Sequence, residues 1–249
     1  MQTITDARHA HLEGKLYNLY RDNWPAAEPA RFGSRQFDGM VVAGGLVRGH
    51  PTTEIPMPKP TGGITLVSSP INDEIHSLRV IHARYGSQPE HTNFLTLEFI
   101  CQNNSFSSPI QWQFQSKIAG QIDAPAFPST FTEGSCCIED GFMVMETANS
   151  RIVKPIQPPY THQYCLMEAL SLYKQTEKTV FSQIYDENVI LPKQVLAPFN
   201  EDLVYTGGHK LFVQSLSLTG PGTLPLLLVC NEQGQLIYTQ NGFELYALQ

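Results

Sequence analysis

The sequence predicts an all-β fold, an antiparallel meander with one helix near its start, and three observations support this prediction. Apolar and polar side chains alternate at a period of two in several segments, as they do in strands with one buried face. Turn signals separate these segments at roughly the 8–12-residue spacing of β-barrels and β-sandwiches. Only 16% of the 249 residues are charged, whereas the wet faces of helices are usually rich in Glu and Lys.

The clearest pair of strands lies at 92–118. In its second half Trp112 and Phe114 alternate with glutamines, so one face is expected to be buried and the other wet. In its first half Leu97 and Phe99 form an apolar face of the same spacing, and asparagines between the halves supply a turn. We therefore predict an antiparallel hairpin.

A second hairpin is predicted around Asp140-Gly141, because a type I′ turn needs positive φ at both central positions and this dipeptide tolerates it. It joins predicted strands at 131–139 and 142–153. Further strands are predicted at 39–49, 64–68, 75–85, 179–185, 209–218, 225–230, 235–239 and 243–248.

A helix is predicted at 6–23. Its leucines recur at three- and four-residue spacing, and Trp24-Pro25 ends it. We expect this helix to pack against the sheet.

The segment 163–174 fits two patterns. Leu166, Met167 and Leu170 share one face of a helix, whereas Leu166, Glu168 and Leu170 alternate as in a strand. We favour the strand, paired in a hairpin with the one that follows it.

Together these elements predict a single domain over residues 1–249. The meander of hairpins favours closure into a lipocalin-like or fatty-acid-binding-like β-barrel, with the N-terminal helix packed on the barrel. A β-sandwich is the alternative, because strand spacing alone does not decide how the sheet pairs.

The composition narrows the classes of partner. A net charge of −7 argues against nucleic acid or an anionic membrane, since both attract basic patches. The most apolar run, 224–230, is too short to span a bilayer, and the N-terminal residues do not resemble a secretory signal. Five cysteines without a framework spacing indicate a reducing compartment. We therefore expect a cytoplasmic protein without a membrane span.

The sequence contains none of the motifs that identify an enzyme directly. Gly-x-Ser-x-Gly, His-Glu-x-x-His and Cys-x-x-Cys are absent, and the glycine-rich stretch 39–49 lacks the residues of a phosphate loop. From these patterns we expect neither a cofactor nor a metal ion. The closely spaced glycines predict a bend or a close backbone approach instead.

The first group of candidate binding residues lies on the strand at 75–85. His82 and Arg84 are about 6.6 Å apart along one face, close enough to share one acidic group of a ligand. His76 is too far along the strand to join them. The alternative is that this face is wet and that the opposite face, with Ile81, lies in the core.

The second group surrounds a proline-rich connection and contains Arg151, Lys154, Tyr160, His162 and Tyr164. Arginine and aromatic side chains suit the rim of a cup from which the polar end of a bound molecule emerges, and an ordinary loop is the alternative. Trp112 is a candidate for the floor of the cavity or for a core residue.

These features predict the binding or transfer of a small hydrophobic ligand with an acidic end inside a β-barrel cavity. The candidate contacts are His82, Arg84, Trp112, Arg151, His162 and Tyr164. One alternative is an isomerase, cyclase or lyase that uses the same cavity, with His82, His162 or Tyr164 as acid or base. Another is a β-sandwich interaction module, which would expose a flat apolar patch.

Overall fold

The computed structural model describes a continuous β-sheet with a short helix. The described residues are 32–41, 61–85, 92–119, 130–170, 177–185, 189–206, 209–231, 234–241 and 244–248. The helix predicted at 6–23 lies outside these ranges, and so do residues 42–49 of the first predicted strand.

The sheet contains fifteen strands in the described part of the chain. Strands β1 to β8 run as an antiparallel meander from the middle of the sheet to one edge, and β9 to β15 return from the other edge to the middle, where β15 pairs with β1. The elements in chain order are β1 (Gly33–Val41), β2 (Gly62–Pro70), β3 (Ile75–Arg84), β4 (Asn93–Gln102), β5 (Pro109–Ile118), β6 (Thr130–Glu139), β7 (Phe142–Thr147), β8 (Ser150–Pro155), β9 (Tyr160–His162), α3 (Gln163–Ala169), β10 (Thr179–Tyr185), β11 (Val189–Thr206), β12 (His209–Gly220), β13 (Thr223–Asn231), β14 (Leu236–Gln240) and β15 (Glu244–Leu248).

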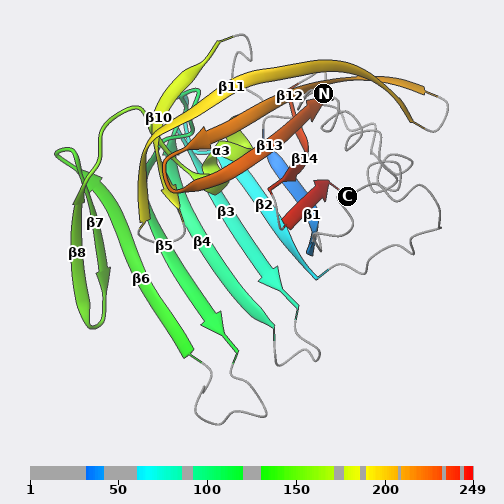
Figure 1. Ribbon diagram of the computed structural model, residues 1–249. Coiled ribbons are helices and arrows are strands. Elements are labelled where there is room, and N and C mark those ends of the chain that lie inside the picture. The colour runs from blue at the N-terminus through cyan, green and yellow to red at the C-terminus, as the bar shows by residue number, and fades with distance from the viewer. Residues whose placement is uncertain are drawn as a thin grey trace.

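The sheet is strongly curved, because its two edge strands are neighbours in the chain. β8 and β9 form the edges, yet only residues 156–159 separate them. Since each residue spans at most about 3.6 Å, the Cα atoms of Pro155 and Tyr160 are at most about 18 Å apart. The result is a half-barrel (Figure 1), which confirms the predicted antiparallel, barrel-like all-β fold.

The first two predicted hairpins are confirmed. Phe99 on β4 faces Trp112 on β5, and both side chains are buried. Asp140 and Gly141 have φ values of 50° and 80°, as the predicted turn requires. Ile118, on the same face as Trp112 at the end of β5, is 58% exposed.

One predicted strand is divided in the structure, and one long observed strand was not predicted. The predicted strand 142–153 is two strands, because a tight turn, in which Thr147 Oγ1 accepts a hydrogen bond from Ser150 N at 3.1 Å, separates β7 from β8. The sequence pattern also misses β11. Pro192 and Pro198 interrupt its alternation, and its pairing register with β12 shifts after Pro198.

The prediction of a strand at 163–174 is wrong, because residues 163–169 form helix α3. All side chains from Tyr164 to Ala169 are buried, so the helix lacks the polar stripe of a surface helix. Its N-cap is His162, whose ring accepts a hydrogen bond from the backbone of Tyr164, and histidine is not a preferred N-cap residue. The usual sequence signals of a helix are therefore missing. β10, the expected hairpin partner, pairs with β9 and β11.

Strand β3 turns its histidine face inward. His76, Leu78 and Val80 are buried, whereas Ile81 and Tyr85 on the other face are exposed. The alternative that placed Ile81 in the core is therefore wrong. Burial decreases toward the C-terminal end of β3. The histidine face is therefore in the core at His76 and becomes accessible to solvent at His82 and Arg84.

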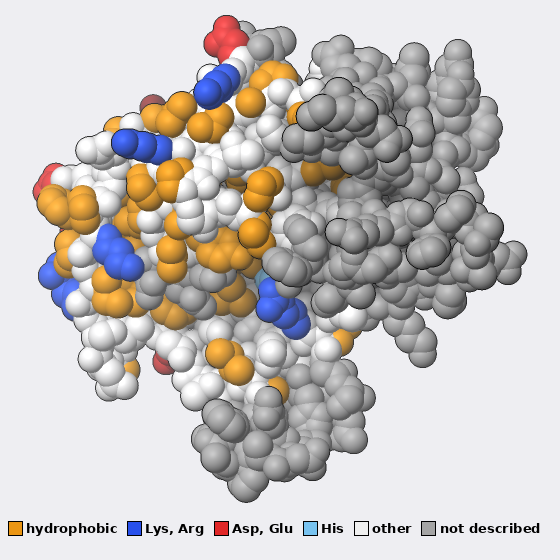
Figure 2. Space-filling view, in the orientation of Figure 1, with side chains coloured by type: hydrophobic (Ala, Val, Ile, Leu, Met, Phe, Trp, Pro, Cys, Tyr) orange, Lys and Arg blue, Asp and Glu red, His pale blue; other side chains and the backbone are white. Residues whose placement is uncertain are grey.

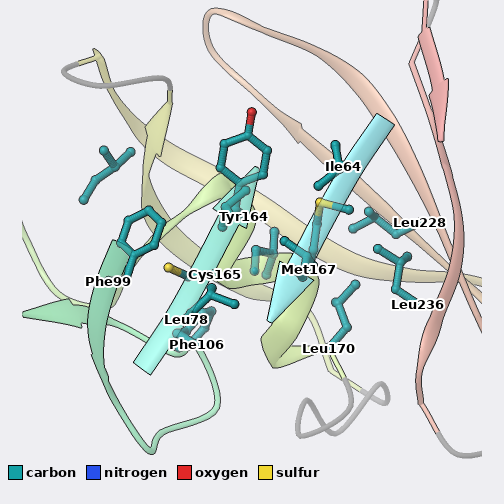
Figure 3. Packing of buried hydrophobic residues seen from close by; sticks show 14 of the residues in the cluster. Ile64, Leu78, Phe99, Phe106, Tyr164, Cys165, Met167, Leu170, Leu228 and Leu236 are labelled. Atoms are coloured by element: carbon teal, nitrogen blue, oxygen red, sulfur yellow. The ribbon is translucent and has the colours of Figure 1, made fainter. Parts of the chain in front are cut away.

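The core lies inside the half-barrel, where α3 packs between the two halves of the sheet (Figure 1). On the helix, Met167 lies beside Ile64 and Leu228, and Leu170 lies below them (Figure 3). On the face of the molecule seen in Figure 2, apolar side chains are interspersed with isolated Lys and Arg side chains. Within the described ranges, no helix is long and apolar enough to cross a membrane.

Candidate functional site

Helix α3 has two faces that contact different parts of the half-barrel. At about 100° per residue, Gln163, Tyr164 and Met167 lie on one side of the helix, whereas Cys165 and Glu168 lie on the other. The first set lines a cavity, and the second contacts β3, β4 and the turn after β4. Figure 3 shows Met167 and Cys165 directed to opposite sides.

The cavity beside α3 has a volume of about 350 Å³, at the lower end of the roughly 300–1,000 Å³ of small-molecule sites. Apolar side chains from both halves of the sheet form most of its wall. Ile64 and Leu228 are buried in its depth, whereas Tyr185 and Leu224, 41% and 53% exposed, border it near the surface. The cavity is therefore an apolar cup that opens to solvent.

A histidine between two tyrosines is the main polar feature of the lining. His82 Nδ1 lies 2.6 Å from Tyr164 Oη, and His82 Nε2 lies 3.0 Å from Tyr246 Oη. A neutral imidazole has one N–H donor and one acceptor nitrogen, so one tyrosine donates its hydroxyl hydrogen to the ring and the other accepts from it. We refer to His82, Tyr164 and Tyr246 as the Tyr–His–Tyr triad.

The imidazole of His82 is uncharged at neutral pH. Burial lowers the pKa of His82 to about 4, and the positive charge of Arg84 acts in the same direction. Arg84 also lines the cavity, at the accessible end of β3. The polar part of the cup therefore combines neutral hydrogen-bonding groups with a cationic side chain.

Sequence reasoning missed Tyr246, the third member of the triad. It reaches His82 across two glycines of neighbouring strands, because Gly39 pairs with Tyr246 on one side and with Gly62 on the other. A Cβ atom at Gly39 would lie 2.6 Å from Cε1 of Tyr246, so the ring lies directly over the glycine backbone. The close approach predicted for the glycine-rich stretch is thus found at Gly39. Tyr246 and Leu248 are two residues apart in the predicted strand 243–248, so they share one face, and Leu248 is buried. This spacing was the signal that could have identified Tyr246.

Aromatic rings continue from the triad into the core. His162 stacks on Tyr164, with ring centroids 5.5 Å apart and an interplanar angle of 26°. Phe99 and Trp112 contact His162 at centroid distances of 4.8 and 6.1 Å. His162 and Trp112 are buried and lie behind the cavity lining, where they hold Tyr164 in position.

Three of the six predicted contact residues line the cup, whereas Trp112 and His162 lie in the core behind it and Arg151 lies elsewhere. His82, Arg84 and Tyr164 line the cavity. Arg151 is on β8, where its Nε lies 3.1 Å from Oε1 of Glu146 and its side chain is 62% exposed. The predicted group around the proline-rich connection is therefore split, and a role for Arg151 in binding stays a prediction.

A buried polar cluster fixes the other face of α3. Glu168, fully buried, accepts a hydrogen bond from Ser107 Oγ and lies 3.5 Å from Nε2 of His76. Burial alone would raise the pKa of Glu168, but the nearby imidazole of His76 and the hydrogen bond from Ser107, together with the charge of Arg35, hold it below its usual value. Glu168 is therefore an ionised carboxylate that ties α3 to the sheet. Among the described residues, no group of three His, Cys, Asp or Glu side chains is placed to hold a metal ion.

A larger groove, about 670 Å³, lies on the outer face of β2 to β8. It contains two exposed ion pairs, Arg79 with Glu98 and Glu146 with Arg151. Water competes with such exposed charges, and the groove has no apolar depth comparable to that of the cup. The cup is therefore the better candidate for a hydrophobic ligand.

Comparison with known proteins supports the fold. No protein-family model and no curated protein matches the sequence. Among solved structures, the chain is similar to a β-barrel-like protein of the domain of unknown function DUF1849 from Brucella abortus, with a TM-score of 0.50 over 89% of this chain and 97% of that one. The two sequences are 10% identical, so the likeness concerns the fold alone.

Proposed function

We propose that this protein binds a small hydrophobic molecule with an acidic end in the cup beside α3, and that it carries or hands over this molecule. The observation that carries the proposal is an apolar cup whose polar end consists of the Tyr–His–Tyr triad beside Arg84. The apolar wall would remove the body of the ligand from water, at about 25 cal/mol for each Å² of buried apolar surface. The polar groups would set its orientation.

The acidic end of the ligand is inferred from charge. The guanidinium of Arg84 is a permanent cation whose planar donors match a carboxylate. The triad adds hydroxyl and imidazole groups without a second charge, because His82 is neutral. The small volume favours a single hydrophobic chain or a compact ring system over a larger ligand.

The first test is native mass spectrometry of the protein purified from its own host, followed by denaturing extraction and an absorption spectrum. We expect a stoichiometric adduct that is released on denaturation. A clean apo mass, with no adduct after incubation with lipid and isoprenoid extracts, would contradict the proposal.

A titration with a dansyl-labelled fatty acid tests the position of the site. Met167→Trp places a larger side chain in the cup and is expected to abolish binding while the far-ultraviolet circular dichroism stays unchanged. Arg84→Gln removes the charge and is expected to weaken binding by roughly ten- to a hundredfold, the range of one charged hydrogen bond. Arg79→Gln, on the outer face of β3, is the matched control, and equal losses in both arginine variants would contradict this placement.

The triad also favours a second candidate function, acid–base catalysis on a ligand in the same cup. A neutral imidazole between two hydroxyl groups can accept a proton on one side and release one on the other. This enzyme would be an isomerase, cyclase or lyase. His82→Gln would then abolish turnover of the extracted ligand and leave its binding intact, whereas a carrier would show no turnover in either form.

A further inference from the structure

Two cysteines meet in the core on the side of α3 that faces away from the cup. Sγ of Cys101 on β4 and Sγ of Cys165 on α3 lie 3.7 Å apart, and both side chains are fully buried. All five cysteines of the chain are free thiols in this structure. We propose that Cys101 and Cys165 form a disulfide when the chain folds in an oxidising environment, and that this bond ties α3 to β4.

The geometry favours this pair over the other cysteines. A disulfide bond is about 2.05 Å long, so the two sulfur atoms need to approach each other by less than about 2 Å. Cys136 and Cys137 are neighbours on an extended strand, and their side chains face opposite sides of the sheet. The thiol of Cys137 contacts a carboxylate oxygen of Glu139 at 3.3 Å.

The bond would form during folding, before α3 is docked. In the folded chain neither thiol reaches solvent, and burial together with the hydrogen bond between Cys165 and Cys101 raises the pKa of the Cys165 thiol. The thiolate is the attacking species in thiol–disulfide exchange, so the docked pair reacts slowly in either direction. The compartment in which the chain folds would therefore set the redox state of Cys101 and Cys165. A reducing compartment would leave both as free thiols.

The exchange needs a disulfide oxidant of low molecular weight, such as oxidised glutathione. One cysteine thiolate attacks the oxidant and releases one thiol, and the other cysteine thiolate attacks the mixed disulfide and releases the second. In total, the two cysteines lose two protons and two electrons, and the oxidant becomes two thiols. This proposal does not depend on the proposed function, although the tied helix also carries Tyr164 and Met167 of the cup.

The experiment compares two refolding reactions of the full chain. The protein is unfolded in guanidinium and refolded either with oxidised and reduced glutathione or with dithiothreitol alone. It is then unfolded again in guanidinium near neutral pH with an excess of N-ethylmaleimide, which alkylates the free thiols. We expect three alkylated cysteines after oxidising refolding and five after reducing refolding, with a proteolytic peptide that links Cys101 to Cys165. The thermal midpoint should be higher by roughly 5–15 °C in the oxidised form, as expected for a closed long loop.

Two variants separate the proposed bond from other effects. Cys137→Ser should keep the linked peptide, and the double variant Cys101→Ala with Cys165→Ala should show the same thermal midpoint after both refolding reactions. Five alkylated cysteines after oxidising refolding, or a linked peptide that contains any other cysteine, would overturn the proposal. The peptide map uses the unaltered chain, so it decides the question even where a variant does not fold.

Discussion

His82 on β3 and Tyr164 on α3 are joined by a hydrogen bond of 2.6 Å between Nδ1 and Oη, although 82 positions separate them in the sequence. The bond fixes the helix inside the half-barrel against the sheet. Tyr246 holds the other ring nitrogen at 3.0 Å, so the imidazole is positioned from both sides. The triad therefore serves the stability of the fold as well as the polar end of the cup, and both roles can be measured.

The neutral state of His82 predicts a loss of stability in mild acid. The pKa of His82 falls from 6.5 to about 4 on folding, so between these pH values the unfolded chain binds a proton that the folded chain does not. The contribution of His82 to the free energy of unfolding is therefore complete above about pH 6.5. It decreases by about 3 kcal/mol as the pH falls toward 4. Urea unfolding of wild type and His82→Gln at pH 7.5 and 4.5 tests this expectation. Equal pH dependence in the two proteins would contradict it.

Removing the charge of Arg84 should raise the pKa of His82. The positive charge opposes protonation of the imidazole, but burial is the larger cause of the shift. In Arg84→Gln the pKa should therefore rise while staying below its ordinary value of 6.5. A titration followed by the imidazole resonances in NMR measures it. Arg79→Gln, on the outer face of the same strand, is the matched control and should leave the pKa of His82 unchanged.

The close approach of Tyr246 to Gly39 predicts a coupled pair of substitutions. In Gly39→Ala the new Cβ atom would overlap the Tyr246 ring, so the ring must move away from His82, at a cost of about 1–3 kcal/mol. The cost should vanish when Tyr246→Ala removes the ring first. A double-mutant cycle from urea unfolding measures this coupling, and the same cost in both backgrounds would argue against the contact.

The hairpins were predictable because their side chains alternate between a buried and a wet face. Phe99 and Trp112 belong to such strands. Asp140-Gly141 is a dipeptide typical of type I′ turns, because both of its residues tolerate positive φ. β11 was not predicted because its prolines interrupt the alternation of apolar and polar residues that indicates a strand. Helix α3 was not predicted because it is buried on all sides. Its acidic residue, Glu168, accepts a hydrogen bond inside the core and does not mark a wet face.

Only the site residues that lie together on one strand could be predicted as a group. His82 and Arg84 are neighbours on β3, and their shared face follows from the alternation. The partner of His82 on β15 depends on the pairing of the first strand with the last, which no local pattern encodes. The position of Tyr164 depends on a helix that the pattern did not reveal. Long-range pairing therefore limited the prediction more than the chemistry of the individual residues did.

Glu168 is expected to contribute strongly to the free energy of unfolding, because it anchors α3 to the sheet. Glu168→Gln keeps the size of the side chain but removes the carboxylate that accepts the hydrogen bond of Ser107, and a hydrogen bond to a charged group contributes about 1.5–3 kcal/mol. Glu98→Gln removes the exposed partner of Arg79 and should cost no more than about 1 kcal/mol. Both values come from urea unfolding at pH 7.5.

The pH dependence of the Glu168 effect has a defined sign. Because the pKa of Glu168 is lower in the folded chain, its stabilisation is complete above the pKa of the unfolded chain and is lost as the pH falls through the folded value. The difference between wild type and Glu168→Gln should therefore shrink in acid. A difference below about 1 kcal/mol at pH 7.5, or one that grows in acid, would show that the carboxylate does not anchor the helix.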